Sequence, residues 1–138
     1  MKSYPYLRAY MAGITIPTVM LIFLITVFTI ARYAFNLSNP IERMIVFPMA
    51  IVPNLWGLWN MLFLRLRPHR YISIGFHGAI LALVQTSIAI GLFKLIDFEL
   101  PEFAWRAWPF AFPVIAIGFY LVWKHVVSFF NTLLGIDG

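Results

Sequence analysis

The chain contains no cysteine among its 138 residues. It therefore has no disulfide, no Cys-ligated zinc or iron–sulfur cluster, no thiol nucleophile and no attachment site for c-type haem. Charged residues are also scarce, at 11% against about 25% in an average soluble domain. Apolar residues make up 62% of the chain, and a chain this small cannot bury that much apolar surface from water. The composition excludes an ordinary soluble domain, a disordered chain and a nucleic-acid-binding module, and it predicts an integral membrane protein.

Long apolar runs with little charge predict four transmembrane helices. A bilayer core of about 30 Å needs about 20 apolar residues in a helix. The runs lie at about residues 10–32, 44–64, 71–96 and 106–124. Because short loops make consecutive helices antiparallel neighbours, we predict one all-α domain over residues 1–138. It is a polytopic integral membrane protein, with a four-transmembrane-helix antiparallel bundle.

The last helix is expected to continue to about residue 134 and to extend beyond the bilayer core. Apolar side chains recur there at helical spacing, and polar ones fall on the opposite side. The apolar set is Val126, Val127, Phe129, Phe130, Leu133 and Leu134, and the polar set is Lys124, Ser128 and Asn131. This pattern predicts an amphipathic C-terminal extension that lies along the membrane surface or docks on a partner.

Two prolines interrupt the second predicted span. Pro48 and Pro53 each remove a backbone donor and free a carbonyl one turn earlier, so a bend is expected between them. The preceding segment, residues 36–40, has the composition of a turn that ends in a helix cap.

The basic residues predict the orientation in the membrane. The formal net charge is +5, and a dense cluster of arginines lies between the second and third spans. Because basic residues favour the cytoplasmic side, both termini are predicted to be cytoplasmic, and the compact loops favour a bacterial inner membrane. Anionic lipid headgroups are expected to contact Arg65, Arg67, Arg70 and Lys124.

No aspartate or glutamate lies inside a predicted span. Ion-coupled and proton-coupled carriers usually keep a buried acid, so its absence argues against that class. The strongly polar side chains within the spans are Asn54, Asn60, Gln85 and His77. They either line a polar cavity at the kinked second helix or form hydrogen bonds across helix contacts, and the second interpretation is favoured.

Two histidines form the one candidate cofactor site. His77 and His125 are expected near the cytoplasmic side of adjacent helices, where two imidazoles can ligate haem or a metal ion. The favoured interpretation is an ordinary helix contact for His77 and an interfacial position for His125. No cofactor is therefore expected.

Small residues follow one side of the third span at intervals of three and four positions. They are Gly75, Gly78, Ala82 and Ala89, with Gln85 between them. Small side chains let helix backbones approach closely. Packing within the bundle is the favoured interpretation, and a seam between identical chains is the alternative.

These features favour a small non-enzymatic membrane protein, a structural or accessory subunit of a larger complex or homo-oligomer. The alternative is a small-solute transporter or channel built around the kinked second helix, and a haem- or metal-binding redox subunit ranks third. The expected partners are the lipid bilayer and another protein or a second copy of the chain, but no nucleic acid.

Overall fold

The computed structural model describes residues 3–38, 50–69, 72–95, 97 and 99–136. Every regular element within these residues is helical, and none is a strand. The elements are α1 (Pro5–Ala34), α3 (Val52–Leu66), α4 (Ile74–Leu95), α5 (Glu102–Val122), η2 (Trp123–Val127) and α6 (Ser128–Leu133). The all-α class predicted from the sequence is therefore confirmed.

Within the described part of the chain, three helical stretches are long and apolar enough to cross a membrane. They are Pro5–Ala34, Ile74–Leu95 and Glu102–Leu133. The last of these joins α5, η2 and α6 into one continuous helix of 32 residues. Its middle part, η2, is wound as a π-helix, a form usually restricted to single turns.

The second predicted span is described only in part. Its first residues, 44–49, lie outside the described part of the chain, and so does Pro48. The predicted bend between Pro48 and Pro53 therefore stays a prediction. Within the described residues, Pro53 occupies the first turn of α3, where its missing N–H has no helical partner to lose. The 15 residues of α3 extend about 22 Å at about 1.5 Å per residue.

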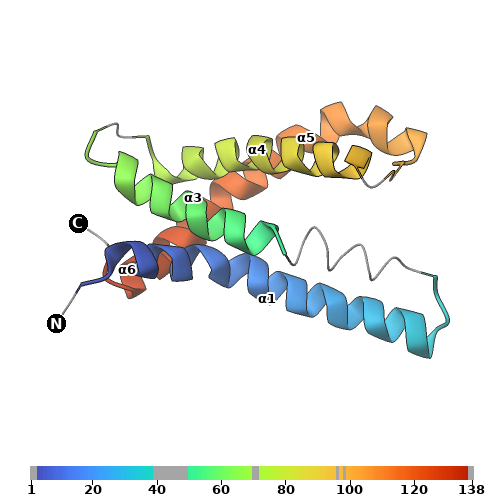
Figure 1. Cartoon of the computed structure of the whole chain (residues 1–138). Coiled ribbons are helices and arrows are strands. Elements are labelled where there is room, and N and C mark those ends of the chain that lie inside the picture. Colours follow the sequence, from blue (N-terminus) through green and yellow to red (C-terminus); the bar gives the residue numbers. More distant parts are fainter. Residues whose placement is uncertain (1–2, 39–49, 70–71, 96, 98, 137–138) are drawn as a thin grey trace.

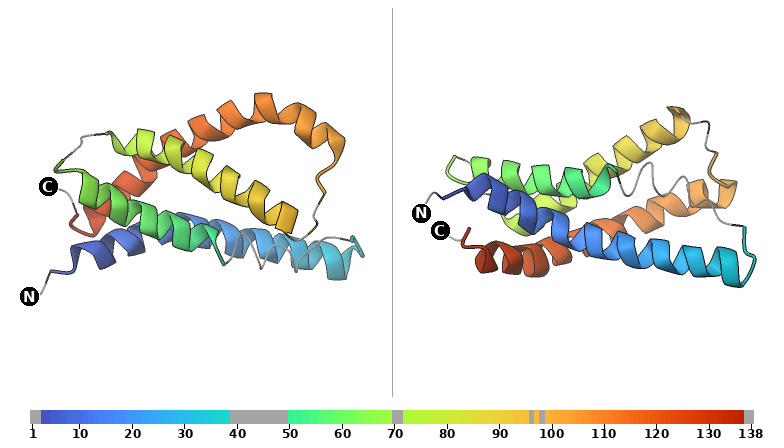
Figure 2. Two further views of the ribbon diagram at one scale, coloured as in Figure 1. Left: turned by 45° about the horizontal axis from the view of Figure 1, so that its top comes forward. Right: turned by 60° about the horizontal axis from the view of Figure 1, so that its bottom comes forward.

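The helices run back and forth along one long axis (Figure 1). Both chain termini, the end of α3 and the start of α4 lie at the same end of the molecule, which we call the terminal end. α1 packs chiefly on α3, and α4 packs chiefly on α5. The long helix leaves α4 as it approaches the terminal end and reaches α1 through α6. It thereby connects the two helix pairs, which the views in Figure 2 show from two further sides.

The buried core lies where η2 and the residues after it pack against α1, α3 and α4. One cluster joins α3, α4 and η2 through Val52, Trp56, Leu81, Trp123 and Val127. A second cluster, nearer the terminal end, holds Ala9, Ala12 and Ile136. In contrast, α5 has no buried residue along its whole length. Packing is therefore dense toward the terminal end and loose toward the opposite end.

Two helix crossings depend on glycine. A Cβ added at Gly78 would lie 2.5 Å from Cγ of Trp123 and 2.6 Å from the carbonyl oxygen of Phe119. A Cβ at Gly13 would lie 2.5 Å from the carbonyl oxygen of Trp56. Real Cβ atoms do not approach other heavy atoms this closely, so each crossing needs a residue without a side chain.

The predicted polar side of the C-terminal extension is wrong for Asn131, whereas Lys124 is exposed. Asn131 is only 4% exposed, whereas Phe129 and Leu133 are 58% and 65% exposed. The buried line consists of Trp123, Val127 and Asn131, spaced four residues apart. Because this line packs on the other helices, α6 is held against α1. Phe130 and Leu134 pack there on the second cluster, whereas Phe129 and Leu133 face outward.

The glycine crossing between α4 and η2 gives a direct test of the packing. We expect Gly78→Ala to lower the free energy of unfolding by about 1–3 kcal/mol, because the added methyl group overpacks the contact with Trp123. Thermal unfolding followed by circular dichroism in detergent micelles measures the change.

Gly91→Ala is the matched control for this substitution. Gly91 lies on the same helix, and a Cβ there would meet no atom within 4 Å. The free energy of unfolding of this variant should rise by up to about 1 kcal/mol, because alanine has a higher helix propensity than glycine. Equal melting temperatures for the two variants would contradict the close crossing.

Candidate functional site

A buried pair of amides joins three helices near the terminal end. Nδ2 of Asn60 on α3 donates to the carbonyl oxygen of Ala9 on α1 and to Oδ1 of Asn131 on α6, each at 2.7 Å. Nδ2 of Asn131 donates back to Oδ1 of Asn60 at 3.1 Å. Asn60 is fully buried. This reciprocal arrangement satisfies most of the polar capacity of both side chains within the protein.

Asn54 lies two turns before Asn60 on α3, but it is exposed. Its Oδ1 accepts a hydrogen bond from the hydroxyl of Tyr10, and its Nδ2 donates to the carbonyl oxygen of Ala50 at 2.8 Å. Asn54 therefore connects α3 to α1 and caps a carbonyl beside its own helix. The structure does not bring Asn54 and Asn60 to a common polar cavity.

Gln85 occupies the middle of α4 and is half-buried. Its Oε1 accepts a hydrogen bond from Nε1 of Trp56 on α3 at 2.9 Å. The indole of Trp56 also packs on the rings of Phe119 and Trp123, with centroids 5.1 and 5.6 Å away. The bond to Trp56 fixes which end of the Gln85 amide faces α3.

His77 is buried between α4 and α3, with 4% of its surface exposed. Its ring meets the ring of Phe63 edge to face at 5.0 Å. Its backbone carbonyl accepts a hydrogen bond from Nε1 of Trp59 at 3.0 Å. Its Nδ1 has no hydrogen-bond partner among the described residues, and the same holds for Nε1 of Trp123. Nδ1 of His77 therefore does not form the hydrogen bond that we predicted for this side chain.

His125 does not join His77 at a common centre. It lies two residues from Trp123 and two from Val127, both of which point into the core, so it lies on the opposite side of η2 and is exposed. Among the described residues no group of three or more His, Asp or Glu side chains is placed to hold a metal ion.

The described basic residues that were predicted to contact lipid headgroups lie toward the terminal end, in different environments. Arg65 is exposed, and Arg67 is half-buried, with its Nη1 3.4 Å from the carbonyl oxygen of Ile136. Lys124 is exposed, and its Nζ lies 5.7 Å from the centroid of the Tyr120 ring. Arg70 lies outside the described residues.

The small-residue face of α4 points toward the long helix. Gly75, Gly78 and Ala82 are buried. A Cβ at Gly75 would meet the ring of Tyr120, as one at Gly78 would meet Trp123. Ala89, nearer the opposite end, is half-buried and lines a groove between α4 and α5. The face therefore packs within the chain at one end and borders open space at the other.

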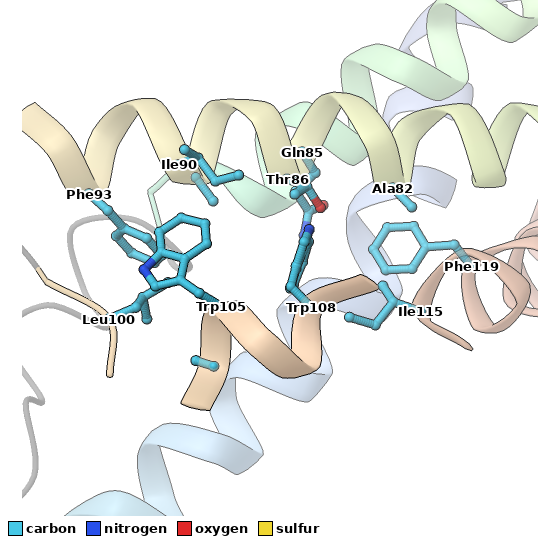
Figure 3. A pocket seen from close by; sticks show the side chains of 12 residues that line it. Ala82, Gln85, Thr86, Ile90, Phe93, Leu100, Trp105, Trp108, Ile115 and Phe119 are labelled. Atoms are coloured by element: carbon cyan, nitrogen blue, oxygen red, sulfur yellow. The ribbon is translucent and has the colours of Figure 1, made fainter. Parts of the chain in front are cut away.

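Two apolar grooves meet at Gln85. The first lies between α4 and α5 and has a volume of about 350 Å³, and the second lies between α1 and the long helix and has about 550 Å³. Gln85, Ile115 and Phe119 line both grooves. Figure 3 shows the first groove, with Gln85 and Thr86 of α4 facing Trp108 of α5.

Sequence reasoning missed two residues that organise this region. Asn131 was predicted to lie on the polar side of the C-terminal extension, although it is the partner of Asn60. No role was predicted for Trp123, although it is fully buried in the core. The regular spacing of Trp123, Val127 and Asn131 was the available signal, because residues four apart share one side of a helix.

No known protein family, curated protein or solved structure matches the chain.

The amide pair gives the second prediction. We expect Asn60→Leu and Asn131→Leu each to lower the free energy of unfolding by about 1–3 kcal/mol, because each leaves a buried amide without its partner. The double variant should cost less than the sum of the two, since it removes both polar groups together. Thermal unfolding of all four chains in micelles measures the coupling free energy.

Asn54→Leu serves as the control on the same helix. Because Asn54 is exposed, its replacement should change stability by only about 0.5 kcal/mol. Additive costs for Asn60→Leu and Asn131→Leu would show that the two amides are not coupled.

Proposed function

We propose that this chain is a non-enzymatic integral membrane protein that acts as a structural or accessory subunit, through helix contacts with another protein or with further copies of itself. The main support for the proposal is that polar side chains form hydrogen bonds between helices of the chain. Asn60, Asn131 and Gln85 each bond to another helix of the chain. Polar groups used in this way hold helices together and do not form a pathway for solutes.

The topology that accompanies this proposal has four crossings. The described helices are compatible with it, because α1 leads away from the terminal end whereas α3 ends there (Figure 1). In the proposed orientation the terminal end is cytoplasmic, in keeping with Arg65 and Arg67 at that end. A bacterial inner membrane is the proposed location.

The transporter alternative needs a polar route through the bilayer. The two grooves that meet at Gln85 are instead lined almost entirely by apolar side chains. Asn54 and Asn60, which would form the polar strip of such a route, are bonded to Tyr10 and to Asn131 respectively. These contacts favour the accessory role over transport.

An apolar stripe on α1 is the proposed contact surface. Val19, Phe23, Val27 and Ile30 lie on one side of the helix and are 43–71% exposed. The nearby hydroxyls of Thr26 and Thr29 donate to carbonyls of their own helix, so the surface stays apolar. Such a stripe can pack against a membrane helix of a second subunit.

Native mass spectrometry of particles ejected directly from the membrane tests the proposal. We expect the chain in a particle of fixed composition that is heavier than the monomer. Phe23→Ala should lower the fraction of that particle severalfold, because it removes an anchor of the α1 stripe, without changing the melting temperature of the monomer.

Leu133→Ala is the control, because Leu133 is also exposed and apolar but lies on α6. It should leave the particle intact. Detection of the wild-type chain only as a monomer would overturn the proposal, and a specific solute flux from the chain alone in liposomes would favour the transporter.

A further inference from the structure

We propose that the grooves meeting at Gln85 form a binding site for a lipophilic quinone, a neutral flat molecule whose carbonyl oxygen accepts a hydrogen bond from the Gln85 amide. All the residues that form the site come from one chain, and its lining shares one residue, Phe23, with the α1 stripe proposed as the contact surface. The proposal concerns binding only, and four features of the groove support it.

The first feature is the shape of the space. The two grooves share Gln85, Ile115 and Phe119 and extend from there in two directions. Their volumes of about 350 and 550 Å³ lie in the range of roughly 300–1,000 Å³ that is usual for small-molecule sites. A ring can occupy the first groove while an apolar tail follows the second.

The second feature is an available hydrogen-bond donor. Oε1 of Gln85 already accepts a hydrogen bond from Trp56, which turns Nε2 away from that indole. Nε2 has no hydrogen-bond partner among the described residues. An amide donor left unpaired in an apolar medium is costly. The groove therefore selects a ligand with an acceptor, such as a carbonyl oxygen.

The third feature is depth and charge. Gln85 lies at the middle of the 22-residue α4, so it lies near the midplane of a bilayer that this helix crosses. The ester carbonyls of phospholipids lie in the interfacial layer, about 15 Å from the midplane of a hydrocarbon core of about 30 Å. Neither groove has a charged side chain in its described lining, so a carboxylate or phosphate would remain unpaired there. A neutral ligand that carries its carbonyl within the hydrocarbon fits both conditions.

The fourth feature is the aromatic lining of the first groove. Figure 3 shows the rings of Phe93, Trp105, Trp108 and Phe119 around the space below α4. Aromatic rings prefer offset-stacked or edge-to-face contacts with other flat rings. This lining favours a quinone ring over a saturated chain of the same volume.

The test uses the full-length protein in nanodiscs of saturated phosphatidylcholine. The probe is a decyl-substituted benzoquinone, and decylbenzene, which lacks the carbonyls, is the matched control ligand. Ligand retained after gel filtration is extracted and quantified against empty nanodiscs. We expect saturable retention of the quinone near one molecule per chain, and no saturable retention of decylbenzene.

Substitutions then locate the site. Gln85→Leu should weaken quinone binding about fivefold, the effect of losing one hydrogen bond. Ala89→Phe should reduce binding at least tenfold, because it fills the first groove. Gly91→Phe is its control, since Gly91 is exposed on the same helix with open space around it. Circular dichroism melting in the same nanodiscs reports whether each variant is folded.

Three results would overturn the proposal. One is equal retention of quinone and decylbenzene by the wild-type chain, which would show that the groove binds any hydrocarbon. This comparison uses no variant, so it is valid even if a variant fails to fold. Another is unchanged quinone affinity in folded Gln85→Leu and Ala89→Phe. The third is a dimer that forms without ligand and excludes the probe, which assigns the groove to a second copy of the chain.

Discussion

The placement of one indole determines how the two helix pairs meet. Trp123 is fully buried, and it fits against α4 only because Gly78 has no side chain. The same indole lies against Trp56 of α3, so one residue of the long helix contacts both pairs. From this point the long helix continues to α1 in one direction and to the looser half of α5 in the other. The tight packing and the grooves therefore result from the same crossing.

Hydrogen bonds between helices reinforce that crossing, and such bonds are needed most in a bilayer core, where water is absent. Asn60 and Asn131 join α1, α3 and α6, and two tryptophan N–H groups join α3 to α4 through Gln85 and the carbonyl of His77. Each such contact contributes only about 0.6 kcal/mol on average in a membrane, but leaving these groups unpaired costs more. Gln85 differs from Asn60 because one of its two polar atoms remains available to a ligand.

The sequence was sufficient for the all-α class and for three helices that are long and apolar enough to cross a membrane, because apolar runs of that length have few other structures. It also singled out Asn60, Gln85 and His77, since polar side chains are rare within such runs. It did not predict Asn131 as the partner of Asn60, because that pairing depends on the long helix continuing against α1. The grooves were likewise beyond prediction, because they depend on where α4 and α5 diverge, a property of tertiary packing.

The loose packing beside α5 costs less free energy in a bilayer than in water. In water, an apolar groove beside α5 would expose surface that costs about 25 cal/mol for each Å². In a bilayer, lipid chains fill the same space, and no hydrophobic force drives the helices together to close it. Shape and apolarity alone therefore cannot make the groove selective, since any lipid tail satisfies them. Selectivity must come from polar groups that a lipid tail leaves unpaired, such as the amide nitrogen of Gln85.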